Sequence, residues 1–326
     1  MQSGGNRRST SPRVIFFPFS AIDGSLARMP DLPNHMGHPP LFDFSASLRA
    51  RRRAQVLAGD CFLDRAGAEG LADRLAAVTR KFALGLWIGA PASEGDPLKE
   101  PVPPDIAPFA QEWVCADFDE HEILNAGENR FDIAASVFSL QAINDLPGAL
   151  VQIRRLLKPD GLLMAALLGG ATLSELRDGF AHAESLTRGG ASPRVSPFAD
   201  VRDLGALLQR GGFALPVSDV ERLMVRYRDF YALARDLRAH GLTNVLSERS
   251  RKFLRRDTLM ALLSHYAAQH ADPDGKLRAR FEILYLTGWS PHDSQQKPLA
   301  PGAAKSRLAD ALGATETVIS GSRTSS

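Results

Sequence analysis

The chain has 326 residues, 44% of them hydrophobic and 23% charged, which is an ordinary balance for a globular protein. Its formal net charge of +2 gives no strong field that would favour nucleic acid or anionic lipid as a partner. No apolar run reaches the roughly 20 residues that a membrane-spanning helix needs. The two cysteines, Cys61 and Cys115, form neither a CxxC pair nor a cysteine–histidine cluster, so we expect no disulfide framework and no metal site.

Residues 1–40 mix Ser, Arg, Gly and Pro around one short apolar patch, Val14–Phe19, and we expect this segment to be disordered. It is rich in Arg and Ser and nearly free of acids, as a transit peptide is. On that interpretation residues 1–30 would direct the chain to a mitochondrial-matrix-like compartment. The alternative that we favour is an over-long start, with Met29 or Met36 as the true first residue. Without a CxxC pair or a cysteine–histidine cluster, a reducing, cytoplasmic compartment fits the chain best.

The apolar pattern predicts a helical lead-in over residues 41–80, followed by a strand at Leu84–Ile88 and then Gly89. Proline in the segment 97–108 predicts a loop. Glu112–Ala116 is predicted to be a strand that ends at Asp117.

The most informative stretch is Phe131–Gly170, which predicts a βαβ unit in a parallel sheet. Phe131–Phe138 is apolar and short enough to be a buried strand. Asn144 and Asp145 then offer cap chemistry, and Pro147 suits the first turn of a helix. Lys158–Gly161 is predicted to end that helix as a tight turn before a second apolar strand.

The C-terminal half predicts helices, a hairpin and an insertion. Thr172 and Glu175 predict a capping box for a helix that reaches about Thr187, and Ser196–Pro197 predicts the start of another. Strands are expected within 213–227 and at 277–287, where apolar residues alternate, with a helical insertion over 229–270 between them. We therefore expect one domain over residues 41–292 and a flexible tail over 293–326.

Several of these motifs resemble known enzymes. Phe131-Asp132, Ser139-Leu140, Asn144–Pro147 and Leu157–Gly161 resemble strand 4 to strand 5 of class I S-adenosylmethionine-dependent methyltransferases. Gly169–Leu173, Ser192–Phe198 and Phe281–Trp289 resemble the BioC-like branch, closest to the complex I assembly factor 5 family, which contains arginine hydroxylases, and its bacterial relatives. The resemblance covers roughly residues 42–313.

The resemblance implies an α/β, Rossmann-like class I methyltransferase fold. Its sheet would be mostly parallel, with an antiparallel last strand. The family fits a helix, strand 2, another helix and strand 3 between Gly89 and Phe131, but this chain lacks the length for all four. We therefore expect a seven-strand-type sheet with a compressed strand 2/3 region, either complete or one strand short.

The resemblance also implies a site for S-adenosylmethionine at Gly89, Asp117, Ser139 and Leu140. The position where the family carries an acid before its glycine-rich turn holds Trp87 here, which puts the affinity for the cofactor in question. Asp117 has three open interpretations. It would accept the ribose hydroxyls if it ends strand 2, lie beside the adenine if it ends strand 3, or cap the turn after its strand.

Further polar residues in the family-like motifs are candidates for an acceptor pocket: Asn144, Asp145, Arg194, Tyr227 and Glu282, with His182, Glu184, Ser192 and Ser196 as additional ones. Each is explained equally well as a cap, a helix-face residue or a strand-pair residue. Gln141-Ala142 replaces a His-Trp pair of these relatives. No catalytic side chain is assigned, because methyl transfer mainly requires in-line positioning.

Three functions remain open. The first is modification of a protein subunit during assembly of respiratory complex I, by methylation or by arginine hydroxylation. The second is carboxyl O-methylation of a small molecule or a carrier-bound acyl chain. The third is a non-catalytic assembly chaperone that no longer needs its cofactor loop.

Overall fold

The computed structural model describes residues 13–16, 39–57, 61–89 and 102–295. The chain divides into a first unit up to Pro291, which contains the helices and strands of the described residues, and a second unit from His292 to Ser326. None of the helices in the described part is long and apolar enough to cross a bilayer.

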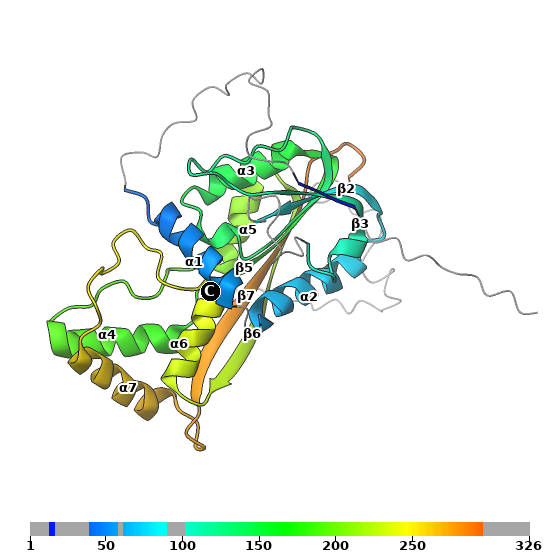
Figure 1. Ribbon diagram of the computed structural model, residues 1–326. Coiled ribbons are helices and arrows are strands. Elements are labelled where there is room, and N and C mark those ends of the chain that lie inside the picture. Colours follow the sequence, from blue (N-terminus) through cyan, green and yellow to red (C-terminus); the bar gives the residue numbers. More distant parts are fainter. Residues whose placement is uncertain (1–12, 17–38, 58–60, 90–101, 296–326) are drawn as a thin grey trace, which may run out of the picture. The chain divides into compact units, whose positions relative to one another are not determined.

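A seven-stranded sheet with the order β1-β3-β2-β4-β5-β7-β6 forms the centre of the first unit (Figure 1). The strands are β1 (Arg13–Phe16), β2 (Phe82–Ile88), β3 (Ala110–Ala116), β4 (Phe131–Val137), β5 (Leu157–Leu168), β6 (Ala214–Tyr227) and β7 (Leu277–Trp289). The pairs from β1 to β5 are parallel, whereas β7 runs antiparallel to both of its neighbours. This arrangement confirms the predicted class I architecture with an antiparallel last strand.

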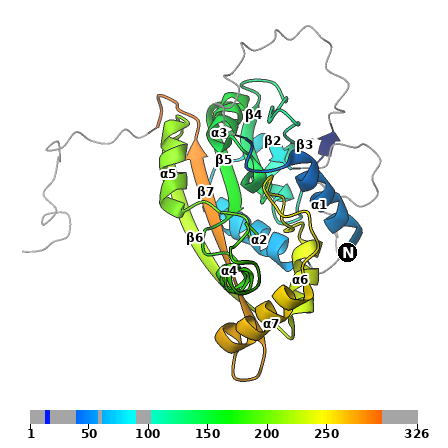
Figure 2. The same ribbon diagram turned by 90° about the vertical axis from the view of Figure 1, so that its left-hand side faces the viewer.

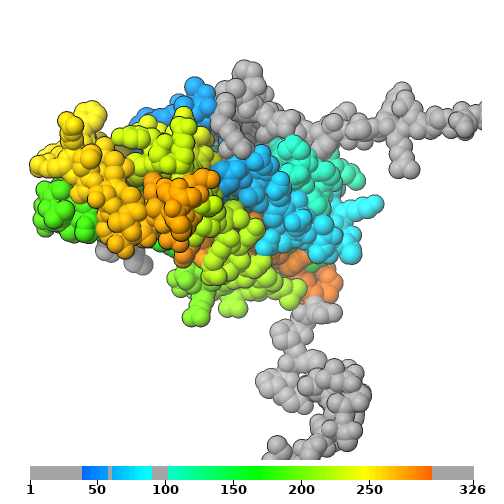
Figure 3. Space-filling model, turned by 90° about the horizontal axis from the view of Figure 1, so that it is seen from below, coloured from blue at the N-terminus to red at the C-terminus, as the bar shows by residue number. Residues whose placement is uncertain are grey.

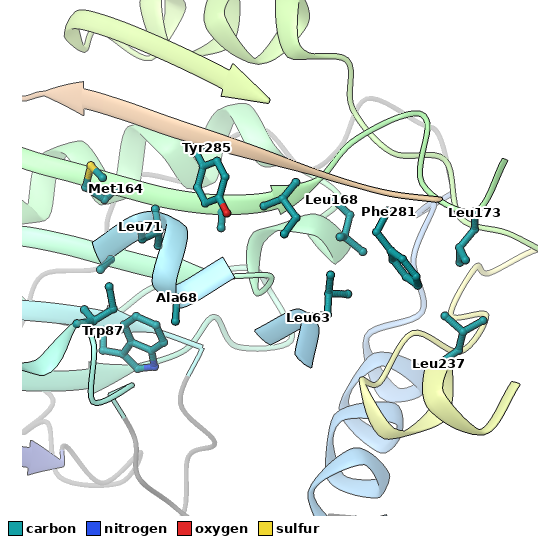
Figure 4. Packing of buried hydrophobic residues seen from close by; sticks show 14 of the residues in the cluster. Leu63, Ala68, Leu71, Trp87, Met164, Leu168, Leu173, Leu237, Phe281 and Tyr285 are labelled. Atoms are coloured by element: carbon teal, nitrogen blue, oxygen red, sulfur yellow. The ribbon is translucent and has the colours of Figure 1, made fainter. Parts of the chain in front are cut away.

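Helices cover both faces of the sheet (Figure 2). They are α1 (Phe44–Leu57), α2 (Phe62–Ala76), α3 (Leu146–Leu156), α4 (Ser174–Arg188), α5 (Val201–Arg210), α6 (Phe230–Ala239) and α7 (Arg256–His270). One buried cluster joins α2, α4, α6 and α7 to the sheet through residues such as Leu71, Leu237 and Tyr285 (Figure 4). A second cluster packs α3 and α5 on the opposite face. The helical insertion and its hairpin are therefore confirmed.

A third, smaller cluster joins the lead-in to the insertion. Phe42, Ala46 and Ala50, in and just before α1, pack against Val245 and Leu246, which follow α6. This contact links segments about 200 positions apart in the chain.

The N-terminal expectation is wrong for Arg13–Phe16. These residues form β1, which pairs in parallel with β3 at the edge of the sheet. The edge of β3 offers unpaired backbone N–H and C=O groups, and a short extended segment satisfies them. The sheet consequently has all seven strands. Among the described residues between Gly89 and Phe131, β3 is the single strand, which confirms the compressed strand 2/3 region. The rest of the segment up to residue 38 and the tail from residue 296 lie outside the described residues.

The predicted tight turn at Lys158–Gly161 is the first, bulged part of β5 instead. The pairing register shifts between Phe131 and Ile133, and Asp160 has a φ of +62°. Polar contacts hold this segment against the sheet: Lys158 Nζ lies 2.8 Å from Asp132 Oδ1, and Arg80 pairs with Asp160. Because these groups satisfy the segment in an extended form, the helix passes into the strand without a separate turn.

The helix starts were predicted correctly only in part. The side chain of Asp145 caps α3 by accepting a hydrogen bond from the Gly148 N–H, as predicted. The capping box at Thr172 and Glu175 is wrong, because Thr172 Oγ1 pairs with the backbone N–H and C=O of Glu282. The start predicted at Ser196 is also wrong, since the residue that caps α5 is Asp200, four positions after Ser196. At Thr172, hydrogen bonds to Glu282 of β7 thus take the place of a local helix cap.

Candidate functional site

A cavity of about 510 Å³ lies at the carboxyl ends of the parallel strands β2 and β4, and we call it the sheet-end cavity. Its walls come from the ends of these strands, from α1, from the starts of α2 and α4, and from the loops at 194–198 and 239–245. The lining residues that matter below are Arg51, Asp64, Gly89, Ser139, Gln141, Arg194, Ser196, His240 and Asn244.

Gly89 and Ser139 meet at the floor of the sheet-end cavity. Gly89 has a φ of +109°, and a Cβ atom added there would lie only 1.8 Å from Ser139 Oγ. The Gly89 N–H donates to the Ala116 carbonyl, which joins the end of β2 to the end of β3. Only glycine fits this position, because Ser139 occupies the space that a side chain at residue 89 would need. The predicted glycine-rich turn after Gly89 lies mostly outside the described residues.

Asp117 lies directly after β3, and β3 pairs with β2. In a doubly wound sheet, the strand that pairs with the first on this side is the second, so the strand 2 placement of Asp117 is the one observed. Its carboxylate is engaged by α1, because Arg51 Nη1 lies 2.6 Å from Asp117 Oδ2. Burial raises the pKa of Asp117 above the usual value for a carboxyl, although Arg51 acts in the opposite direction.

Arg51 connects this acid to the cavity. It belongs to a basic run of α1 that also contains Arg49, Arg52 and Arg53, and it lines the cavity. Its Nε is buried and has no hydrogen-bond partner among the described residues. A buried donor without a partner is costly, so this atom offers a contact to a polar ligand.

The other candidate residues are placed unevenly. Arg194 and Ser196 line the cavity, whereas Leu140 is buried beside it. Asn144 holds the lead-in instead, since its side chain bonds the backbone N–H and C=O of Phe42. Tyr227 is buried and donates to Asp236, and burial raises its pKa far above that of a free tyrosine.

Glu282 lies apart from the sheet-end cavity. It accepts hydrogen bonds from Arg222 and from the Ala171 N–H, and it lines a separate groove beside β6 and β7. Among the described residues, the structure thus brings Gly89, Ser139 and Arg194 to one cavity and keeps Glu282 out of it.

Glu184 fixes the position of Arg194. The Glu184 side chain is fully buried, and its carboxylate accepts hydrogen bonds from Arg194 Nη2 at 2.6 Å and from the Ser192 N–H at 2.5 Å. Burial alone would raise the pKa of Glu184, but its bonds with Ser192 and Arg194 lower it overall. Glu184 does not line the cavity itself, but it holds Arg194, which does, in place.

Two residues of the opposite wall had no signal in the sequence. The His240 side chain is 3% exposed and its Nε2 accepts from the Leu63 N–H, which ties the end of α6 to the start of α2. Burial raises the pKa of Asp64, against the opposing effect of His240. These residues are 176 positions apart, so only the tertiary fold brings them together. Gln141 also lines the cavity, and its Oε1 accepts from the Leu168 N–H.

Known proteins match this chain over its methyltransferase-like part and, in one case, also over the C-terminal insertion. A family model described as "Methyltransferase domain" matches residues 40–216. The mitochondrial arginine-hydroxylase NDUFAF5 of Rattus norvegicus is 34% identical over 84% of this chain and 83% of that protein. The NDUFAF5 of Danio rerio is 43% identical, but the alignment spans only 60% of each chain.

A malonyl-[acyl-carrier protein] O-methyltransferase of Laribacter hongkongensis is 35% identical over 58% of this chain and 60% of that one. The match to the rat protein covers more of this chain, and it is long enough to include the helical insertion at 229–270. The chain therefore belongs to the methyltransferase domain family and, within it, to the branch represented by the NDUFAF5 proteins.

Proposed function

We propose that the chain is an S-adenosylmethionine-dependent enzyme that binds its cofactor in the sheet-end cavity. The observation that carries this proposal is the place of the cavity, because open α/β sheets bind nucleotides at the carboxyl ends of their strands. Two features fit such a ligand. Gly89 lines the cavity at the end of β2 without a side chain, and the partnerless Arg51 Nε offers a donor within the wall.

S-adenosylmethionine supplies a methyl group on a positively charged sulfur. The chain's own residues bind and orient it. Asp117, which follows β3 beside the cavity lining, would accept the ribose hydroxyls once Arg51 turned from it, and Gly89 would present backbone without a side chain. The walls from α1 and the 239–245 loop exclude water. No side-chain base is assigned, since positioning is the main requirement of the transfer.

We further propose that the acceptor is a protein side chain presented during assembly of respiratory complex I. The support is the match to the NDUFAF5 proteins, whose name includes arginine hydroxylation. Asp64 in the cavity wall offers a carboxylate to an arginine guanidinium, a pairing that gives strong charge-assisted hydrogen bonds. The proposed location is the bacterial cytoplasm, or the mitochondrial matrix if residues 1–30 act as a transit peptide.

Calorimetry with S-adenosylmethionine tests the cofactor site. Hydrogen bonds to a charged group contribute about 1.5 to 3 kcal/mol, so Asp117→Asn should weaken binding by roughly tenfold or more. Arg51→Gln frees Asp117 but also removes the Nε donor, so it should weaken binding less than Asp117→Asn does if the carboxylate holds the ribose. Asp145→Asn is the matched control, because Asn caps a helix about as well as Asp.

The outcomes separate the possible functions. Absence of both heat and thermal stabilisation at millimolar cofactor would refute the proposal and favour the non-catalytic chaperone, since a ligand that binds only the folded state must stabilise it. Equal affinity in wild type and Asp117→Asn would remove Asp117 from the site.

A second candidate acceptor is a carboxyl group on a carrier-bound acyl chain, which the match to the Laribacter protein favours. Incubation with methyl-labelled cofactor and each acceptor class decides between them. Label on the acyl carboxyl supports the second candidate, and label on a protein arginine supports methylation of the first. Oxygen-dependent gain of one oxygen atom by the arginine, without label, supports hydroxylation.

A further inference from the structure

A cluster of two histidines and one aspartate lies between α4 and α7, outside the sheet-end cavity. His265 Nε2 and His270 Nε2 of α7 each lie 2.8 Å from Asp178 Oδ2 of α4. The three ligand atoms all lie within 4.8 Å of one another. Figure 3 shows α4 in green and α7 in gold side by side at the surface of the first unit.

We propose that Asp178, His265 and His270 bind a divalent first-row transition-metal ion. Two imidazole nitrogens and a carboxylate oxygen suit zinc and iron(II), whereas magnesium and calcium prefer sites made entirely of oxygen. The cluster was not recognisable from the sequence, because Asp178 is 87 positions from His265. The sequence had predicted no metal site on the basis of its cysteines alone.

The contacts of Asp178 with the two histidines require only a small adjustment to admit an ion. Zinc-bound nitrogen and oxygen atoms lie about 2.0 to 2.2 Å from the metal, which sets ligand atoms of a tetrahedral site roughly 3.4 Å apart. The 2.8 Å separations from Asp178 would therefore widen by about 0.6 Å. The Asp178 side chain is 54% exposed and can move outward by that amount.

The scaffold holds the histidines while leaving the metal accessible. A Cβ at Gly179, beside Asp178, would lie 2.8 Å from Leu262, so α4 and α7 pack closely at this point. The His182 ring stacks on His265 at a centroid distance of 4.1 Å, and Tyr266 contacts the edge of His270. Three ligands on packed helices leave the remaining coordination positions open to solvent, as in catalytic or exchangeable sites and unlike closed structural zinc sites.

The test is metal binding by the full chain after removal of metal with a chelator. Calorimetry with zinc chloride, and with iron(II) under anaerobic conditions, should show one ion per chain, and magnesium should show none. His265→Ala and His270→Ala should each weaken zinc binding by at least about tenfold, the loss that even an outer partner of a metal ligand can cause. His121→Ala is the matched control, because His121 is an exposed histidine far from the cluster in sequence, and it should bind zinc as the wild type does.

Circular dichroism checks that each variant is folded, and cobalt(II) binding to the wild type supplies a measurement that needs no variant. Visible absorption bands of protein-bound cobalt, displaced by zinc, support the site. No binding of zinc or cobalt, or unchanged zinc affinity in a folded His265→Ala/His270→Ala double variant, would overturn it. In that case Asp178 serves only as a hydrogen-bonding clamp between the two helices.

Discussion

Glu184 offers a sharp test of how the cavity wall is built. Glu184→Gln keeps the size of the side chain but removes the charge that Arg194 and Ser192 share. Breaking a buried ion pair by changing one partner costs about 3 to 5 kcal/mol, and the glutamine retains part of the hydrogen bonding, so we expect a loss near 3 kcal/mol. For a domain of this size that loss lowers Tm by roughly 6 to 12 °C.

The pH dependence gives the same experiment a second readout. The pKa of Glu184 in the folded protein lies below the ordinary value of 4.5, so its contribution to stability is fully present above that value. The contribution is lost as the pH falls through the lowered, folded-state pKa. The difference in unfolding free energy between wild type and Glu184→Gln should therefore be constant at neutral pH and shrink in acid.

Denaturant unfolding at several pH values measures both effects, and Glu248→Gln, at an exposed position, is the charge-matched control. The expected Tm of the control lies close to that of the wild type. The reasoning fails if Glu184→Gln is as stable as the control at neutral pH, or if its deficit stays the same well below pH 4.5.

Three further predictions follow from single residues. Gly89→Ala places a Cβ against Ser139 at a φ of +109° and should lower the free energy of unfolding by about 1 to 3 kcal/mol. Gly211→Ala, at a helical φ, should lower it less, and equal melting temperatures of the two variants would contradict this. Asp145→Ala should cost about 1 kcal/mol and Asp145→Asn only a few tenths, and equal losses would argue against its role as a cap. Burial raises the pKa of Cys115 to about 12, so a thiol reagent at pH 8 should modify this residue after denaturation but not in the folded protein. Rapid reaction of both cysteines in the native state would refute the burial of Cys115.

The sheet was largely predictable because its signals are local. A short stretch of sequence is enough to predict each of three elements: the strand at Phe131–Val137, the helix capped by Asp145 and the long alternating strand at Leu277–Trp289. A buried strand is a short apolar run, and a helix start is a cap residue before an amphipathic pattern. These features need no knowledge of what lies elsewhere in the chain.

The predictions that failed have the opposite cause, because they concern residues whose structure depends on distant parts of the chain. Thr172 had the spacing of a capping residue, but the backbone of Glu282, 110 positions away, competes for its hydroxyl. The segment Arg13–Phe16 is too short and too isolated to predict a strand, and only the free edge of β3 makes it one. Arg51 likewise belonged to a basic run whose members look equivalent until the fold brings Asp117 to one of them.

The same long-range contacts decide what the cavity can recognise. The family model ends at residue 216, so it covers the strands β2 to β5, which carry Gly89 and Ser139 at their ends, but not the loop at 239–245. That loop, through Val245, packs on Phe42 and α1, and Asn144 bonds the backbone of Phe42 from the other side. On the proposed function, the strands β2 and β4 would position the cofactor, and the lead-in and the insertion would form the wall that faces an acceptor. Since these two segments contact each other beside the sheet-end cavity, a change in either one should then alter the acceptor side without altering the strands that hold the cofactor.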